Sequence, residues 1–293
     1  LEMSIVVTTP TGQIGSQVVR GLIRAGERPS VIVRDPSRLA ADVLPYVQVF
    51  QGASDDVEVV ARAIDGASSI FWLTPPNYGS QDPFADYARF AQTLVDAAKR
   101  TSAPHIVHLS SDGAQFRHGL GLIDAVGASE TTLDTLGGNV LHLRPGFFYE
   151  NFLWQVEPIR SGHIFQAVPG ETVTNFVATS DIAEVAVLRL LARNWTGTET
   201  QLIHGPERLS FLQATEAISA GIGKPVKFVH ASDEDTKAGF MANGGSEAVA
   251  EPYVQMFRAM RGAPSILDPR NPFTTGKTTL AEWAFRVLRP IVG

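Results

Sequence analysis

The chain has 293 residues, a net charge of −6 at neutral pH and no cysteine. This length suits one large α/β domain, or a domain with a smaller appendage. The lack of cysteine excludes disulfides, thiol catalysis and cysteine-ligated metals, and we expect no metal site. An acidic balance without a basic cluster argues against a nucleic-acid partner.

The sequence has no apolar run near the length of a membrane span, and its first residues carry no signal pattern. We therefore expect a cytoplasmic protein that does not engage a membrane. Met3 is expected to be the natural start, preceded by a vector remnant.

The first strand, turn and helix predict a dinucleotide-binding unit. Residues 5–7 are a β-branched run that suits a buried strand, and residues 13–22 have apolar side chains at helical spacing. Gly12 would let a phosphate approach the backbone, and Gly15 would let the helix pack closely on the strand. The first glycine of the usual fingerprint is Thr9, so an ordinary strand-to-helix turn is the alternative.

The N-terminus of this first helix would offer free N–H groups and the positive end of its dipole to a pyrophosphate. The residues expected to contact the cofactor at this turn are Thr9, Thr11, Gly12, Gln13 and Ile14.

The second strand, 30–33, predicts which dinucleotide is bound. The end of this strand meets the adenosine ribose, where a carboxylate would select NAD. Arg34 stands there instead, with Arg38 one turn later. Two guanidinium groups suit a 2′-phosphate, which favours NADP(H) over NAD(H). The alternative is a pair of solvated loop arginines.

Strands and helices continue to alternate. Strands are predicted at 47–50, 69–73 and 105–109, with helices at 56–64 and from Pro83 to about residue 98. This alternation is typical of a parallel sheet with helices on both faces.

The end of the strand 69–73 is a second place where a cofactor is touched, through Leu73, Thr74 and Pro75. Tyr78 follows in an extended loop; it either closes over a ligand or is a simple loop aromatic.

The second half is less regular. We predict a helix at 124–136, strands at 140–143, 172–177, 200–203 and 226–230, and a helix at 182–191 capped by Thr179, Ser180 and Asp181. Further helices are predicted at 210–221, 232–241, 246–260 and 278–288. Aromatic and polar residues follow the strand 140–143, and they either pack in the core or line a pocket over the nicotinamide: Phe147, Phe148, Tyr149 and Asn151.

These elements predict an α/β fold, a doubly wound parallel sheet of Rossmann type with a small C-terminal α/β substrate region. Residues 3–150 would form the dinucleotide-binding domain, with the sheet also completed by about 172–204. Residues 151–293 would form mainly the substrate-binding region, interleaved with the first.

A set of short motifs in a fixed order extends over nearly the whole chain, at residues 8–15, 33–36, 71–75, 108–114, 143–146 with 150–151, 180–183 and 282–284. Through them the sequence resembles the NmrA-like branch of the atypical short-chain dehydrogenase/reductases. The resemblance implies a Rossmann-type sheet, a nicotinamide dinucleotide and a small C-terminal region over the nicotinamide. Members of the branch include quinone, azo- and triphenylmethane-dye-type reductases, isoflavone-type reductases, and regulators that bind dinucleotide without turning it over.

Three departures from the branch affect the chemistry. Thr9 replaces a glycine, and the Gly-Asp after the third strand is Gly52-Ala53. Val126 stands where the branch often has His or Lys, four residues before Glu130. The Tyr-x-x-x-Lys pair of ordinary short-chain dehydrogenases is absent, which leaves Tyr149, Ser110 and Ser111 as weak candidates for a proton donor.

Three functions follow, in order of preference. The first is an NADPH-dependent reductase that transfers hydride to a small conjugated or quinone-like substrate. The second is a non-catalytic NADP(H) sensor that binds a protein partner, and the third is a biosynthetic enzyme that uses the fold for a non-redox step. For the reductase the expected partner is a small molecule, and a homodimer is one option for its assembly.

Overall fold

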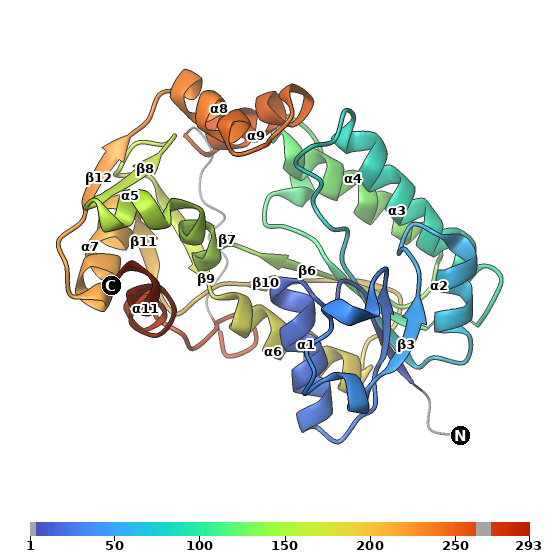
Figure 1. Cartoon of the computed structure of the whole chain (residues 1–293). Helices are drawn as coiled ribbons and strands as arrows, with labels where there is room; N and C mark the ends of the chain where they lie inside the picture. The colour runs from blue at the N-terminus through green and yellow to red at the C-terminus, as the bar shows by residue number, and fades with distance from the viewer. Residues whose placement is uncertain (1–3, 103, 262–270) are drawn as a thin grey trace.

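The computed structural model describes residues 4–102, 104–261 and 271–293 of the chain. The expected start at Met3 lies outside these residues. At the centre is a parallel sheet of seven strands in the order β10-β6-β5-β4-β1-β2-β3 (Figure 1). The strands are β1 (Ile5–Val7), β2 (Ser30–Val33), β3 (Gln48–Gln51), β4 (Ser69–Trp72), β5 (His105–Leu109), β6 (Val140–Pro145) and β10 (Thr198–Ile203). The strand order reverses between β1 and β4, which confirms the doubly wound Rossmann-type sheet.

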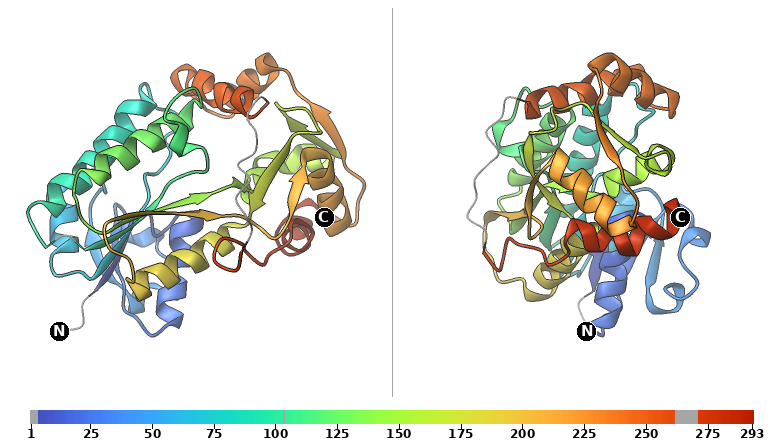
Figure 2. Two further views of the ribbon diagram at one scale, coloured as in Figure 1. Left: turned by 180° about the vertical axis from the view of Figure 1, so that it is seen from behind. Right: turned by 90° about the vertical axis from the view of Figure 1, so that its left-hand side faces the viewer.

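Helices cover both faces of this sheet, as Figures 1 and 2 show. One face is covered by α1 (Gln13–Arg24) and α6 (Thr179–Ala192), and the other by α2 (Val57–Ile64), α3 (Pro83–Ala98) and α4 (Leu122–Asp134). Because successive strand residues point to opposite faces, Val7 packs in the core beneath α1 and α6, whereas Val6 packs beneath α2 and α3.

The C-terminal region lies beyond the carboxyl ends of the central strands (Figures 1 and 2). It contains a three-stranded sheet, β11-β9-β7, and a two-stranded sheet, β12-β8. Its elements are β7 (Phe147–Phe148), α5 (Val156–Arg160), β8 (His163–Gln166), β9 (Val173–Val177), β11 (Arg208–Ser210), α7 (Phe211–Ile222), β12 (Lys227–His230), α8 (Asp233–Ala242), α9 (Glu247–Met260), α10 (Leu280–Trp283) and α11 (Arg289–Val292). A separate apolar core, which includes Phe176, Phe211 and Trp283, holds these elements together.

The expectation that the chain from 172 to 204 completes the central sheet needs a correction. β10 lies at the edge of that sheet, but β9 pairs with β7 and β11 in the small sheet. The reason lies at Gly146, where a Cβ atom would be 2.1 Å from the carbonyl oxygen of Asn175. This close approach brings β9 alongside the continuation of β6 and away from its edge.

The predicted cap of α6 is also wrong. The helix begins at Thr179, and its N-cap is Ala178. The carboxylate of Asp181 instead accepts hydrogen bonds from the backbone N–H of Thr278, at 3.0 Å, and from its hydroxyl, at 2.8 Å. Asp181 therefore ties the C-terminal segment to the dinucleotide-binding half.

The helix predicted at 278–288 is divided. α10 is followed by a wider helical turn over Ala284–Leu288 and then by α11.

In the described part of the chain, no helix is both long and apolar enough to cross a membrane.

Candidate active site

The turn after β1 has the close backbone packing that the two glycines predict. A Cβ atom on Gly15 would lie 2.1 Å from the carbonyl oxygen of Thr9, a distance that real Cβ atoms do not adopt. The N–H of Gly12 donates to that same oxygen at 2.9 Å. Thr9 has a φ of 50°, in the left-handed region that favours glycine. The loop therefore keeps the conformation of a glycine fingerprint, with strain at Thr9.

The first turn of α1 has free backbone donors. Its N-cap is Gly12, which has no side chain to cap them. The hydroxyl of Thr9 is buried and has no hydrogen-bond partner among the described residues. Thr11 and Gln13 are exposed at this turn, whereas the side chain of Ile14 is buried in the core. These residues fit an anionic ligand held by backbone N–H groups, as a dinucleotide pyrophosphate would be.

The end of β2 carries two exposed arginines, Arg34 and Arg38. Their side chains make no hydrogen bond or ion pair with any residue that the structure describes. The carboxylate of Asp35, between them, caps the short helix Pro36–Arg38 and accepts hydrogen bonds from Ser37. These hydrogen bonds lower the pKa of Asp35. The charge of Arg38 also lowers this pKa, but among the described residues neither guanidinium group is held in an ion pair, so both can meet an anion.

In the branch that the sequence resembles, an aspartate follows the third strand at the position of Ala53. The two carboxylates nearest to Ala53 in the chain are not free to replace it. Asp55 forms an ion pair with Arg89, in which Oδ2 is 3.1 Å from Nε. Asp56 caps α2 through the N–H groups of Glu58 and Val59. Both carboxylates are therefore used within the protein.

The end of β4 lies beside the turn after β1. The hydroxyl of Thr8 donates to the carbonyl oxygen of Phe71 at 3.0 Å and accepts from the N–H of Leu73 at 3.0 Å. The next residue, Thr74, is buried, and in the part of the chain that the structure describes its hydroxyl has no hydrogen-bond partner. The predicted cofactor residues of the two loops thus come together at the carboxyl edge of the sheet.

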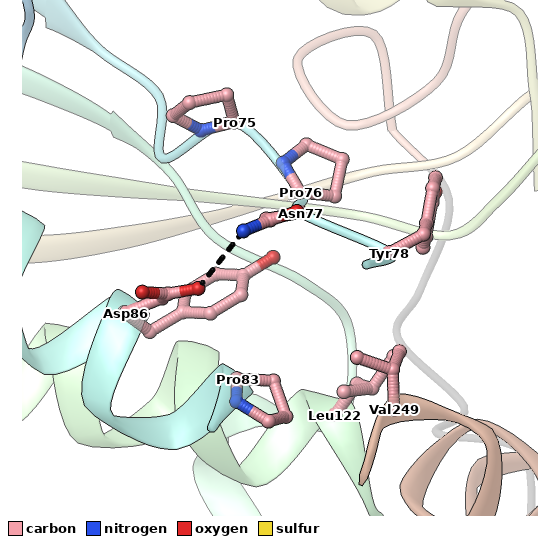
Figure 3. Close-up of a pocket in the computed structure, with 9 residues that line it drawn as sticks. Pro75, Pro76, Asn77, Tyr78, Pro83, Asp86, Leu122 and Val249 are labelled. Carbon is pink, nitrogen blue, oxygen red and sulfur yellow. Dashed lines mark hydrogen bonds between the residues drawn. The ribbon is translucent and has the colours of Figure 1, made fainter. Parts of the chain in front are cut away.

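A small pocket opens directly after these residues (Figure 3). The cavity itself is small, about 20 Å³ for the centre of a water-sized sphere, and it opens into a solvent-exposed hollow of about 290 Å³ in all. It is lined by Pro75, Pro76, Asn77 and Tyr78 from the loop after β4, Pro83, Asp86 and Tyr87 from α3, Leu122 from α4 and Val249 from α9. The dashed line in Figure 3 is the hydrogen bond from Asn77 Nδ2 to Asp86 Oδ2, at 3.3 Å. From the sequence, Pro75 was predicted as a cofactor contact and Tyr78 as a substrate contact, and the lining residues from the helices were missed.

Tyr78 joins the loop to the C-terminal helices. Its ring lies edge-on to Trp154, at 5.3 Å, and to Phe240 of α8, at 5.7 Å. Its carbonyl oxygen accepts a hydrogen bond from the N–H of Ser246, at the start of α9, at 2.8 Å. Burial raises the pKa of Tyr78. Tyr78 is therefore both a pocket residue and one of the contacts between the two halves.

The aromatic residues after β6 lie mostly in the C-terminal core. Tyr149 is fully buried, its ring is 5.8 Å from that of Trp283, and its hydroxyl donates to the carbonyl oxygen of Thr278 at 3.0 Å. Phe147 packs against Phe152, Phe176 and Phe211, Phe148 packs against the core beneath α1 and α6, and Asn151 is exposed. These placements fit the core-packing alternative, so Tyr149 is a poor candidate for a proton donor or a substrate contact.

The two serine candidates have partners within the protein. Ser111 Oγ donates to the carbonyl oxygen of Asp112 at 3.1 Å. Ser110 Oγ donates to the fully buried carboxylate of Glu130, which also pairs with Arg144 and Arg117, each at 2.7 Å. Burial alone would raise the pKa of Glu130, but hydrogen bonds from Arg144 and Ser110 lower it to about 2. Ser110 therefore belongs to a buried ionic network.

A second buried group adjoins this network. His108 and His142 share a hydrogen bond between their Nδ1 atoms at 2.9 Å, and His142 Nε2 is 2.9 Å from Asp134. Burial lowers the pKa of His108 to about 3, so its ring is neutral at physiological pH. Sequence reasoning named Ser110 but missed both groups, although His108, His142 and Arg144 lie on the side of β5 and β6 that faces α4.

Known proteins match this chain along most of its length. The model of the NmrA-like family matches residues 2–269. A NAD(P)H azoreductase from Xenophilus azovorans is 28% identical over 255 residues, which are 86% of either chain. A (4-alkanoyl-5-oxo-2,5-dihydrofuran-3-yl)methyl phosphate reductase from Streptomyces griseus is 26% identical over 93% of either chain.

A solved structure shares the fold. It is an NADPH-dependent quinone oxidoreductase from Escherichia coli in complex with NADPH, 22% identical, with a TM-score of 0.77 over 96% of this chain and 98% of that one. Together with the family match, this likeness confirms the predicted resemblance. The chain belongs to the NmrA-like family.

Proposed function

We propose that this chain is an NADPH-dependent reductase that transfers hydride to a small conjugated or quinone-like organic acceptor. Both relatives are named as reductases, and the name of the azoreductase also gives NAD(P)H as its cofactor, which supports the class of an NAD(P)-dependent oxidoreductase. The preference for NADPH and the conjugated acceptor are inferred from this chain's own residues.

One observation supports the dinucleotide above all others. The free N-terminus of α1 and the free guanidinium groups of Arg34 and Arg38 lie at adjacent strand ends of one sheet. The N–H groups of Gln13 and Ile14 would hold the pyrophosphate, and the two arginines would hold a 2′-phosphate. Leu73, Thr74 and Pro75 would contact the cofactor where β4 ends, beside the pocket.

Residues of the pocket would position the acceptor against the cofactor. When bound, NADPH supplies the hydride. The pocket after Pro75 would hold the acceptor next to the cofactor, and closeness and orientation are the main requirements for hydride transfer. Tyr78 and the start of α9 shield this place from water on the side of the C-terminal helices.

We expect Arg34→Ala to weaken NADPH binding by roughly tenfold, because a charged hydrogen bond to the 2′-phosphate is lost. NADH has no 2′-phosphate, so its affinity is expected to change little. Arg24→Ala is the matched control, because this exposed arginine lies at the C-terminal end of α1, away from the strand ends. Calorimetric titration of each variant with both dinucleotides measures the effect. An equal loss for NADPH and NADH would contradict the assignment of the 2′-phosphate site.

A non-catalytic NADP(H) sensor is the second candidate. It is favoured by Val126, a half-buried apolar residue at the position where the branch often has His or Lys. A turnover assay with NADPH and menadione separates the two functions, because a sensor binds NADPH without oxidising it. If neither NADPH nor NADH binds, the non-redox alternative takes first place.

A further inference from the structure

The pocket after Pro75 contains a phenol that the fold does not use. We propose that Tyr87 is a catalytic residue whose hydroxyl donates a hydrogen bond to the acceptor atom that gains negative charge during reduction. The acceptor would be a flat, uncharged, conjugated carbonyl compound. This inference rests on the proposed reductase function and assigns it a proton donor.

The lining of the pocket defines the class of acceptor. Its walls include Pro75, Pro76, Pro83, Leu122 and Val249, which suit a flat apolar ring. Figure 3 shows these side chains around one space. The nine lining residues include one carboxylate and neither Lys, Arg nor His.

The single carboxylate of the lining, Asp86, is already paired. Its Oδ1 is 2.9 Å from Arg89 Nη1, and its Oδ2 accepts the hydrogen bond from Asn77. A hydrogen bond from the hydroxyl of Ser80, together with those from Arg89 and Asn77, outweighs burial and lowers the pKa of Asp86. Asp86 thus anchors the loop to α3 as a neutralised pair. A pocket with apolar walls and no free charge favours an uncharged acceptor over an anionic or cationic one.

Tyr87 lines this pocket, and its hydroxyl is a free donor. Among the residues that the structure describes, it has no hydrogen-bond partner, in contrast to the hydroxyl of Tyr149, which donates to the carbonyl oxygen of Thr278. Burial raises the pKa of Tyr87, with a smaller contribution from Tyr78, so the phenol stays protonated and remains a donor at physiological pH. The carbonyl oxygen of Tyr87 accepts from Ser129 Oγ of α4 at 3.5 Å, and α3 is a regular helix. The phenol is thus carried by a rigid element, as a positioned donor requires.

The proposed step adds one hydride and one proton to the acceptor. A quinone-type acceptor gains two electrons and one hydrogen as hydride from NADPH, and the negative charge collects on its conjugated oxygen. The O–H of Tyr87 stabilises that charge and passes its proton to the oxygen, which gives the hydroquinone. Tyr87 then regains a proton from water at the open side of the pocket.

The test compares Tyr87→Phe with Tyr253→Phe in the full-length protein. Tyr253 is the matched control, because burial raises its pKa to about 12 and its ring stacks on Phe240, yet it does not line the pocket. With NADPH and menadione, we expect Tyr87→Phe to lower kcat by roughly 100-fold and to leave the Kd for NADPH unchanged. We also expect the solvent deuterium isotope effect on kcat in Tyr87→Phe to differ from that of wild type. Tyr253→Phe should behave as wild type in all three measurements.

Two further variants examine the pocket itself. Leu122→Phe should raise the KM for menadione without changing the Kd for NADPH, because the larger ring fills the space that the acceptor needs. Tyr78→Phe separates the two phenols of the lining, since only Tyr87 is proposed to donate the proton.

The outcomes are distinct. A kcat for Tyr87→Phe within twofold of that for Tyr253→Phe, or a loss confined to Tyr78→Phe, overturns the role of Tyr87 and leaves the reductase function standing. A wild-type protein that does not oxidise NADPH with menadione overturns the proposed function and, with it, this inference. Thermal unfolding of each variant accompanies the kinetics, and a loss of kcat that follows a loss of folding supports a structural role and overturns the proposal.

Discussion

Gly15→Ala is expected to abolish tight NADPH binding. The new methyl group would lie 2.1 Å from the carbonyl oxygen of Thr9 and 2.7 Å from its carbonyl carbon. Both atoms belong to the backbone, so the whole turn after β1 must move away from α1. We expect the Kd for NADPH to rise by roughly 100-fold and the free energy of unfolding to fall by about 1–3 kcal/mol.

Gly138→Ala is the control for this variant. A Cβ atom on Gly138 would meet no atom within 4 Å, and its φ is not in the left-handed region. This change should affect neither binding nor stability. Titration with NADPH and urea unfolding measure the two quantities. Unchanged NADPH affinity in Gly15→Ala would show that the turn after β1 does not form the cofactor site.

Glu130→Gln is expected to destabilise the protein by about 3–5 kcal/mol at pH 7, because it leaves two guanidinium groups facing a buried site without a counter-charge. The carboxylate is fully buried and pairs with Arg117 and Arg144. The loss should appear as a lower midpoint of urea unfolding. Glu58→Gln is the control, because the pair between Glu58 and Arg100 is largely exposed and is expected to contribute at most about 1 kcal/mol.

The effect of Glu130→Gln should depend on pH with a definite sign. Burial would raise the pKa of Glu130, but its hydrogen bonds to Arg144 and Ser110 lower it from 4.5 to about 2. A group with a lowered pKa in the folded state stabilises the fold above its ordinary pKa and loses this contribution as the pH falls toward the lowered value. Wild type and variant should therefore differ fully above pH 4.5 and converge toward pH 2. A difference that is independent of pH in this range would contradict a charged, buried Glu130.

The order of strands and helices in the dinucleotide-binding half could be predicted because each element carries its own local signal. Residues 30–33 and 69–72 are buried strands that the sequence marks by short apolar runs, and Asp82 and Pro83 mark the start of α3. The alternation of strands and helices predicts a parallel sheet with helices on both faces. The dinucleotide-binding turn after the first strand is what favours the doubly wound form, in which the strand order reverses.

The C-terminal region was harder to predict because its structure depends on contacts between distant segments. β9 is placed by the close approach of Asn175 to Gly146, and Asp181 is turned toward Thr278. Both contacts involve residues that are far apart in the chain, so no local pattern indicates them. The assignment of 172–177 to the central sheet failed for this reason.

The cofactor side of the site could be proposed from sequence, whereas the acceptor side could not. Gly12, Gly15 and Arg34 lie within one strand-turn-helix-strand unit, where spacing fixes their relative positions. In the sequence, Tyr87 is one more side chain on the predicted apolar face of α3, and nothing marks it as a pocket residue. Val249 comes from a helix that follows Tyr87 by more than 150 residues. Tyr149 was attractive as a phenol just past a strand end, but its hydroxyl is bound in the C-terminal core.

The most direct measurement is a calorimetric titration of the wild-type protein with NADPH and with NADH at fixed ionic strength. The free N-terminus of α1 beside Arg34 and Arg38 is expected to bind NADPH at least roughly tenfold more tightly than NADH. Equal affinity for the two dinucleotides would contradict the 2′-phosphate site. No binding of either would contradict the central claim, because the strained Thr9 and the altered Ala53 would then have disabled the site.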